Sequence, residues 1–181
     1  MEPLGDDELL YIFNKKSFAQ VSKQFMKVAC TRLYWLYNSF PDLLFDILPS
    51  SPNLRRFYCT KPLSNSHLKL LAQSCPKLQK LILAQDVDTS SEPCEIDFDD
   101  DGLCAVANAC SHVREVYLNR RLHVGDAGIV SLATSCKNLI KLNLEGCIRV
   151  TDESLKAVGE SCIHDLNLGG CYCWKSVNNE E

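Results

Sequence analysis

Residues 110–135, CSHVREVYLNRRLHVGDAGIVSLATS, and residues 136–161, CKNLIKLNLEGCIRVTDESLKAVGES, are two copies of one 26-residue pattern. In each copy apolar residues follow the opening cysteine at fixed positions, and an aspartate then precedes a second apolar group. The distance from that second group to the next cysteine recurs four times along the chain: Leu68 to Cys75, Leu103 to Cys110, Ile129 to Cys136 and Leu155 to Cys162. The chain is therefore built from internal repeats.

Each repeat predicts one strand and one helix. The alternating run Leu142-Asn143-Leu144 suits a strand that turns one face to a core. The Asp or Asn that follows, such as Asp152, suits a helix N-cap, and the spacing of the apolar residues after it predicts one buried helix face. Because such a unit cannot bury its own apolar face, the units must stack into an α/β solenoid, with parallel strands inside and helices outside.

The spacing from Cys136 to Asp152, with leucines at fixed positions between them, resembles the cysteine-containing subtype of the leucine-rich repeat. The resemblance implies four to five repeats within residues 38–175, followed by a polar tail at 176–181. In the family that it resembles, this repeat subtype usually forms the substrate-binding half of an F-box protein. The F-box itself would then lie in the N-terminal segment.

Residues 1–37 resemble a shortened, degenerate F-box, with two helical segments separated only by Asn14, Lys15 and Lys16. The resemblance implies a surface that docks the adaptor subunit of an SCF-type ubiquitin ligase, through Leu4, Leu9, Leu10, Ile12, Phe13, Val21 and Phe25. The connection is shorter than the family pattern, and Gly5, Ser22 and Phe25 replace its usual Pro, Cys and Trp. The alternative is a helical cap that shields the end of the first repeat.

Composition indicates a soluble intracellular chain, cytoplasmic or nuclear. It has 181 residues and a net charge of −4, and its acidic start lacks the pattern of a secretory signal.

The cysteines follow the repeat rather than a disulfide scheme, so Cys75, Cys110, Cys136 and Cys162 are expected to be buried thiols at helix ends. We also expect the aromatic residues 34, 35, 37, 40 and 45 to pack between the N-terminal helices and the first repeat.

An acidic insertion interrupts the repeats at residues 86–101, where eight acidic residues occur without a basic one. It is expected to form a solvated loop that contacts a basic partner or pairs with Arg120 and Arg121. Asp86, Asp88 and Ser90 alternate as in a calcium loop, but the glycine and the bidentate glutamate of such loops are missing.

At the C-terminal end, Leu166 and Leu168 come two positions earlier than the repeat predicts. This leaves a strand edge that must be covered by Tyr172 and Trp174 or by a partner.

No catalytic constellation, cofactor motif or metal site is evident. The four histidines lack ligand spacing, the Cys171-Tyr172-Cys173 pair has no second pair, and dispersed Lys and Arg argue against nucleic acid. The outward positions of the strands remain as a candidate surface for a protein substrate: Arg56, Tyr58, Lys80, Ile82, Glu115, Tyr117, Asn119, Lys141, Asn143 and Glu145.

The two resemblances together predict a non-enzymatic substrate-recognition subunit of an SCF-type ubiquitin ligase, with the adaptor, and through it a cullin, and a protein substrate as partners. A leucine-rich-repeat scaffold or assembly factor without ligase coupling is the alternative. A thiol-redox or metal-dependent enzyme is a third possibility.

Overall fold

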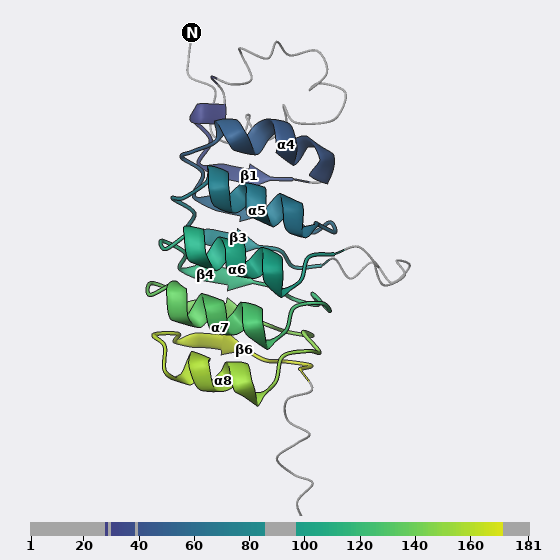
Figure 1. Ribbon diagram of the computed structural model, residues 1–181, viewed down its shortest axis with the longest axis vertical. Helices are drawn as coiled ribbons and strands as arrows, with labels where there is room; N and C mark the ends of the chain where they lie inside the picture. Colours follow the sequence, from purple (N-terminus) through teal and green to yellow (C-terminus); the bar gives the residue numbers. More distant parts are fainter. Residues whose placement is uncertain (1–27, 29, 39, 86–96, 172–181) are drawn as a thin grey trace, which may run out of the picture.

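Strands and helices alternate along the whole described part of the chain. The computed structural model describes residues 28, 30–38, 40–85 and 97–171. In chain order the elements are β1 (Trp35–Tyr37), the 3₁₀ turn η1 (Pro41–Leu43), α4 (Leu44–Ile47), the 3₁₀ turn η2 (Leu48–Ser50), β2 (Arg56–Tyr58), α5 (Asn65–Ser74), β3 (Lys80–Ile82), α6 (Asp100–Ala109), β4 (Glu115–Tyr117), α7 (Asp126–Ser135), β5 (Lys141–Asn143), α8 (Asp152–Gly159) and β6 (Asp165–Asn167). The helices stack in one layer in front of the strands (Figure 1). The predicted α/β repeat architecture is confirmed.

The strands form one parallel sheet in the order β1-β2-β3-β4-β5-β6. The pairing has no offset, so the first residue of each strand lies beside the first residue of the next. Trp35–Tyr37 forms the first strand of the sheet, so the sheet begins before residue 38, where the sequence analysis placed the start of the repeats. Short strands in exact register place equivalent side chains of successive repeats in straight rows.

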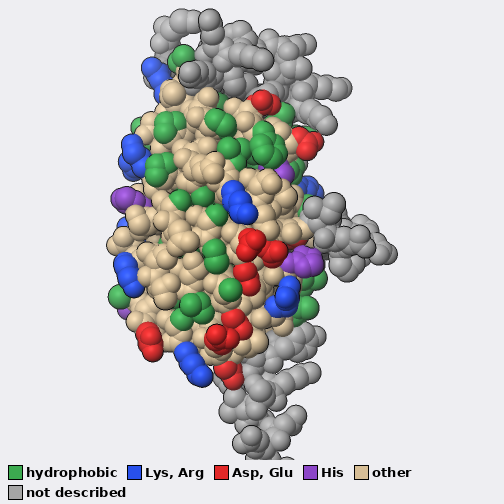
Figure 2. Space-filling model, viewed as in Figure 1, with side chains coloured by type: hydrophobic (Ala, Val, Ile, Leu, Met, Phe, Trp, Pro, Cys, Tyr) green, Lys and Arg blue, Asp and Glu red, His purple; other side chains and the backbone are tan. Residues whose placement is uncertain are grey.

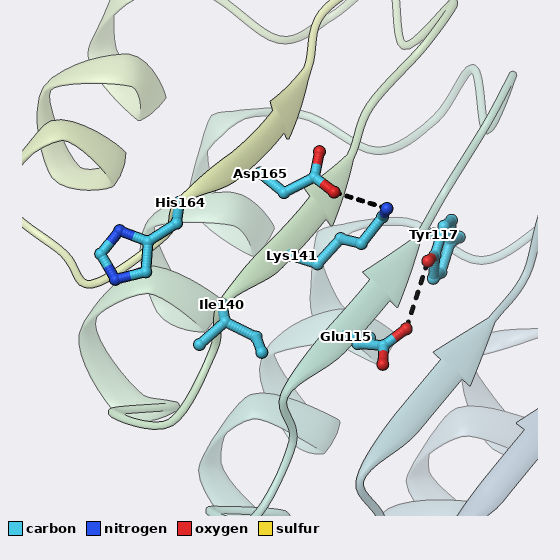
Figure 3. Close-up of a pocket in the computed structure, with 6 residues that line it drawn as sticks. All are labelled: Glu115, Tyr117, Ile140, Lys141, His164 and Asp165. Atoms are coloured by element: carbon cyan, nitrogen blue, oxygen red, sulfur yellow. Dashed lines mark hydrogen bonds and ion pairs between the residues drawn. The ribbon is translucent and has the colours of Figure 1, made fainter.

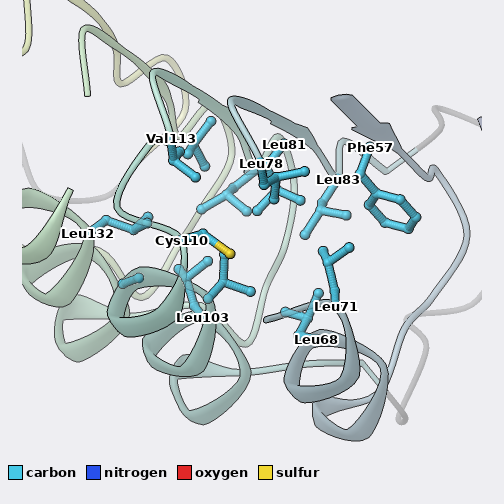
Figure 4. Close-up of a cluster of buried hydrophobic side chains, with 14 of the residues drawn as sticks. Phe57, Leu68, Leu71, Leu78, Leu81, Leu83, Leu103, Cys110, Val113 and Leu132 are labelled. Carbon is cyan, nitrogen blue, oxygen red and sulfur yellow. The ribbon is translucent and has the colours of Figure 1, made fainter. Parts of the chain in front are cut away.

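The core lies between the sheet and the helices. The middle residue of each of the first five strands is buried against the helix layer: Leu36, Phe57, Leu81, Val116 and Leu142. Figure 4 shows how leucines of α5 and α6 meet strand residues such as Leu81 in this interior. Fully burying one such side chain stabilises the fold by about 1.5–3 kcal/mol. Because neighbouring repeats stack on one another, each added repeat extends one continuous core.

The Asp or Asn that recurs at the start of each helix has a different structural role from the N-cap that the sequence predicts. These residues are the first residues of their helices, and the N-caps are the preceding Ser64, Asp99, Gly125 and Thr151. Their side chains instead accept hydrogen bonds from the N-cap backbone of the next repeat: Asp99 N to Asn65 Oδ1 at 3.1 Å, Gly125 N to Asp100 Oδ1 at 2.7 Å and Thr151 N to Asp126 Oδ1 at 2.8 Å. We call these three contacts the side-chain ladder.

Three of the four repeat cysteines are buried as predicted. The thiols of Cys75 and Cys110 donate to the backbone carbonyls of Ser51 and Cys75, at 3.4 and 3.5 Å, and Cys136 is also buried. The prediction for Cys162 is wrong, because this residue is exposed. Helix α8 ends at Gly159, so Cys162 has moved from the helix end into the turn that follows.

The end of the acidic insertion is anchored in the fold. Arg121 is fully buried and forms an ion pair with Asp97 at 2.9 Å, which confirms one of the two predicted pairings. Beyond Asp97 the chain is packed rather than solvated, since Phe98 is buried and Asp100 begins α6. The candidate calcium ligands Asp86, Asp88 and Ser90 lie outside the described residues.

Candidate functional site: the strand surface

The first and third residues of each strand point away from the helices and form two parallel rows. We call these rows together the strand surface. The first-position row is Trp35, Arg56, Lys80, Glu115, Lys141 and Asp165, and the third-position row is Tyr37, Tyr58, Ile82, Tyr117, Asn143 and Asn167. The alternation within each strand and the exact register between strands produce this surface.

Eight of the ten predicted substrate-binding residues lie within the two rows. The other two, Asn119 and Glu145, follow the ends of β4 and β5 and are joined by a hydrogen bond from Asn119 Nδ2 to Glu145 Oε2 at 3.2 Å. The structure adds Trp35, Tyr37, Asp165 and Asn167, which the sequence analysis did not include. Their alternation with Leu36 and Leu166 is the signal that could have identified them.

Ion pairs neutralise the charges of the first row from β3 to β6. Lys80 Nζ lies 2.6 Å from Glu115 Oε2, and Lys141 Nζ lies 2.5 Å from Asp165 Oδ2. The hydrogen bond from Lys80 lowers the pKa of Glu115, and the bond to Asp165 raises the pKa of Lys141. Both shifts favour the charged forms, so this stretch is a charged but internally paired surface at neutral pH.

A shallow hollow of about 340 Å³ lies over β4, β5 and β6 (Figure 3). It is lined by Glu115, Tyr117, Ile140, Lys141, His164 and Asp165. Tyr117 stands at its edge and donates to Glu115 at 3.2 Å, while Lys80 and Lys141 lie 5.1 and 5.7 Å from the ring centroid. The cations and the carboxylates in the hollow therefore already have partners within the protein.

Aromatic side chains dominate the β1 end of the strand surface. Trp35 and Tyr37 are 43% and 44% exposed, and Tyr37 stacks on Tyr58 with ring centroids 4.8 Å apart. The N-terminal helices on which this aromatic group was expected to pack lie outside the described residues, so that packing stays a prediction. Tyr34, Phe40 and Phe45 are also between 39% and 55% exposed.

The predicted adaptor-binding residues lie outside the described residues, and so do Tyr172, Trp174 and the polar tail. Of the C-terminal predictions, the early strand is confirmed, since Leu166 pairs in register with Leu142. Leu166 is 38% exposed because no described element covers the outer side of β6.

The buried thiols are expected to be unreactive near neutral pH. Burial raises the pKa of Cys75 and Cys110 to about 12 and that of Cys136 to about 11, so they stay protonated near neutrality. A protonated, buried thiol is a poor nucleophile and a poor metal ligand. Within the described residues, His, Cys, Asp and Glu do not gather in groups of three that could hold a metal ion.

The helix side differs from the strand surface in character. Figure 2 shows hydrophobic and basic side chains scattered over it in small groups, with acidic side chains on the right of the view and at its lower end. None of the described helices has the length and apolar composition needed to cross a bilayer. The strand surface, with its rows of aromatic and charged side chains, is therefore the candidate binding site.

Comparisons with known proteins show the fold alone. No protein-family model matches the chain, and no curated protein matches it in sequence. Among solved structures, it is similar to a chain in the crystal structure of the Rad7 and Elc1 complex from yeast, with a TM-score of 0.54 and 18% sequence identity. The match covers 89% of this chain and 48% of that chain, so the present chain spans about half its length. Together with the repeat spacing, this likeness supports a solenoid of the leucine-rich-repeat type.

Proposed function

We propose that this protein is the substrate-recognition subunit of an SCF-type ubiquitin ligase, which holds a target protein on its strand surface for ubiquitin-dependent degradation. The observation that carries the proposal is the continuous six-stranded surface in a chain whose N-terminal segment resembles an F-box. The subunit supplies no catalytic group. It raises the effective concentration of a target lysine near a ubiquitin-charged enzyme.

Two further observations support this proposal. The buried thiols have raised pKa values, which disfavours the thiol-redox alternative. The structural neighbour was crystallised with a second protein, Elc1, so a chain of this fold associates with another subunit. In our proposal the equivalent partner here is the SCF adaptor, which links the chain to a cullin in the cytoplasm or nucleus.

Binding of the full chain to purified SCF adaptor tests the proposal. We expect a complex at micromolar concentration that Leu10→Asp and Val21→Asp abolish, because a charge on an apolar docking helix must be desolvated on binding. Tyr117→Ala on the strand surface is the matched control and should bind like the wild type. A wild-type chain that is folded by circular dichroism but does not bind would contradict the ligase assignment.

The alternative is a scaffold or assembly factor without ligase coupling. The short connection Asn14–Lys16 between the two F-box-like segments favours it, because a shortened F-box presents less apolar surface to an adaptor. The same binding experiment separates the two functions. A scaffold retains partners on its strand surface and fails to bind the adaptor.

A further inference from the structure

One cation on the strand surface is left without an ion pair. In the first-position row the charged residues are, in order, Arg56, Lys80, Glu115, Lys141 and Asp165. Lys80 forms an ion pair with Glu115, and Lys141 forms one with Asp165. Arg56, on β2, is exposed and has no acidic partner within the described residues. The β1–β2 end of the strand surface therefore carries a spare positive charge, whereas the β4–β6 end is neutral.

The residues beside Arg56 are aromatic. Trp35 is its direct neighbour on β1, and the stacked pair Tyr37 and Tyr58 occupies the adjacent row. We call Trp35, Tyr37, Arg56 and Tyr58 the aromatic corner. Exposed Trp and Tyr beside an Arg form the combination that dominates binding energy at protein interfaces.

The hollow over β4–β6 is a poorer site for a charged ligand. An anion that approached Lys141 would have to displace Asp165, which lies at 2.5 Å. A cation that approached Glu115 would have to displace Lys80, at 2.6 Å. Such an exchange replaces one ion pair by another and yields little net free energy, whereas an anion at Arg56 replaces only water.

We propose that the aromatic corner binds a segment of the target protein in which an acidic side chain is flanked by apolar or aromatic residues. The guanidinium of Arg56 can receive a carboxylate through two parallel hydrogen bonds. Trp35 and Tyr37 provide apolar contact area around that bond and shield it from water, which strengthens it. A single arginine matches a carboxylate, while recognition of phosphorylated motifs draws on clusters of arginines.

This inference rests on the proposed use of the strand surface for target binding, and it is tested without any ligase component. Wild-type full chain and its Arg56→Glu variant are each used to select from a random-peptide display library. We expect the wild type to enrich peptides with Asp or Glu next to apolar residues. The variant should lose that preference and favour Lys or Arg, because the sign of the local charge is reversed.

An enriched peptide is then measured by fluorescence polarisation beside two copies of it, one with Asn and one with phosphoserine in place of the acidic residue. The Asn copy and the variant Arg56→Ala should each weaken binding about tenfold or more, since a charge-assisted hydrogen bond contributes about 1.5–3 kcal/mol. Trp35→Ala should weaken it to a similar extent, because it removes apolar contact area that surrounds this bond. Arg149→Ala, at an exposed arginine outside the strand surface, is the matched control and should bind like the wild type, while Lys141→Ala measures any contribution of the hollow. Because Arg56 is exposed, its variants should keep the unfolding transition of the wild type.

Three results would overturn the inference: selections that do not differ between wild type and Arg56→Glu, binding that depends on Lys141 rather than Arg56, or a phosphoserine copy that binds more tightly through Lys80. Loss of adaptor binding with intact acidic-peptide selection would remove the ligase function and leave the aromatic corner standing. Adaptor binding without selection of acidic peptides would remove the aromatic corner as a binding site and leave the ligase function standing.

Discussion

At the scale of single residues, Arg121 shows how one side chain holds several repeats together. Its Nη1 donates to both Asp97 oxygens, at 3.0 and 2.9 Å, its Nη2 donates to the Lys61 carbonyl at 3.0 Å, and its Nε donates to the Leu83 carbonyl. In the next repeat the equivalent position is Cys147, whose thiol donates to the Leu118 carbonyl. Arg121 therefore makes the backbone contact that Cys147 makes in the next repeat, and it also binds Asp97 at the end of the insertion.

Replacing Arg121 should be strongly destabilising. Arg121→Met leaves the Asp97 carboxylate buried without its partner, and breaking a buried pair in this way costs about 3–5 kcal/mol. Urea unfolding followed by circular dichroism measures the loss. Adding Asp97→Asn to that variant should recover part of it, because the uncompensated charge is removed.

The exposed Arg114→Met is the matched control for this experiment and should change the unfolding free energy by no more than about 0.5 kcal/mol. An Arg121→Met variant as stable as the control would show that the pair does not hold the insertion.

At the scale of elements, the side-chain ladder determines how each helix is placed on the one before it. The helices approach so closely that a Cβ atom at Gly102 would lie 2.6 Å from Asn65 Oδ1, and one at Gly128 would lie 2.8 Å from Asp100 Oδ1. Glycine at these positions leaves room for the ladder side chain of the preceding repeat. The small residues and the Asp or Asn column therefore function together.

Removing one ladder contact should weaken the stack in a pH-dependent way. Burial raises the pKa of Asp126, but hydrogen bonds from Thr151 and Ser154 outweigh it and lower the pKa overall. A lowered folded-state pKa stabilises the protein above the unfolded-state pKa, and this contribution is lost as the pH falls through the folded-state value.

Asp126→Ala should accordingly cost about 1 kcal/mol at neutral pH, a value reduced for the solvent exposure of the site. Denaturant unfolding at neutral and at strongly acidic pH measures the difference from the wild type, which should shrink in acid. Glu160→Ala, at an exposed residue outside the ladder, is the matched control and should cost no more than about 0.5 kcal/mol at either pH. A cost for Asp126→Ala that does not change with pH would contradict an ionised ladder contact.

At the scale of the whole molecule, the structure is a line of units that contact mainly their neighbours. Helices α5, α6 and α7 each have a helix on both sides, whereas β1 and β6 are the two edges of the sheet. Leu166 on β6 is partly exposed, while its equivalent Leu142 on β5 is fully buried. Stability in such a stack is the sum of local terms and nearest-neighbour terms, so the ends are weaker than the middle.

Hydrogen exchange should follow this gradient. We expect the backbone amides of α6, α7 and β4 to exchange most slowly and those of β6 and α8 to exchange fastest, because opening the last unit breaks only one interface. Mass spectrometry of peptides from the native full chain measures the rates. Equal protection in α7 and α8 would show that the chain opens as one cooperative body.

The amino-acid sequence by itself determined the repeat, the alternation of strand and helix, the rows of outward strand residues and the position of the insertion. These follow from periods of two and about 3.6 residues within one unit and from the 26-residue spacing between units, which are local properties of the chain. Only the tertiary structure decided that the Asp and Asn column joins neighbouring repeats, that Arg121 is buried on Asp97, and that Cys162 lies in solvent. It also decided that Arg56 alone keeps a free charge among the described residues of the two rows. These features depend on which side chains of different units come within hydrogen-bonding distance, and that distance is set by the stacking of the units and not by their spacing along the chain.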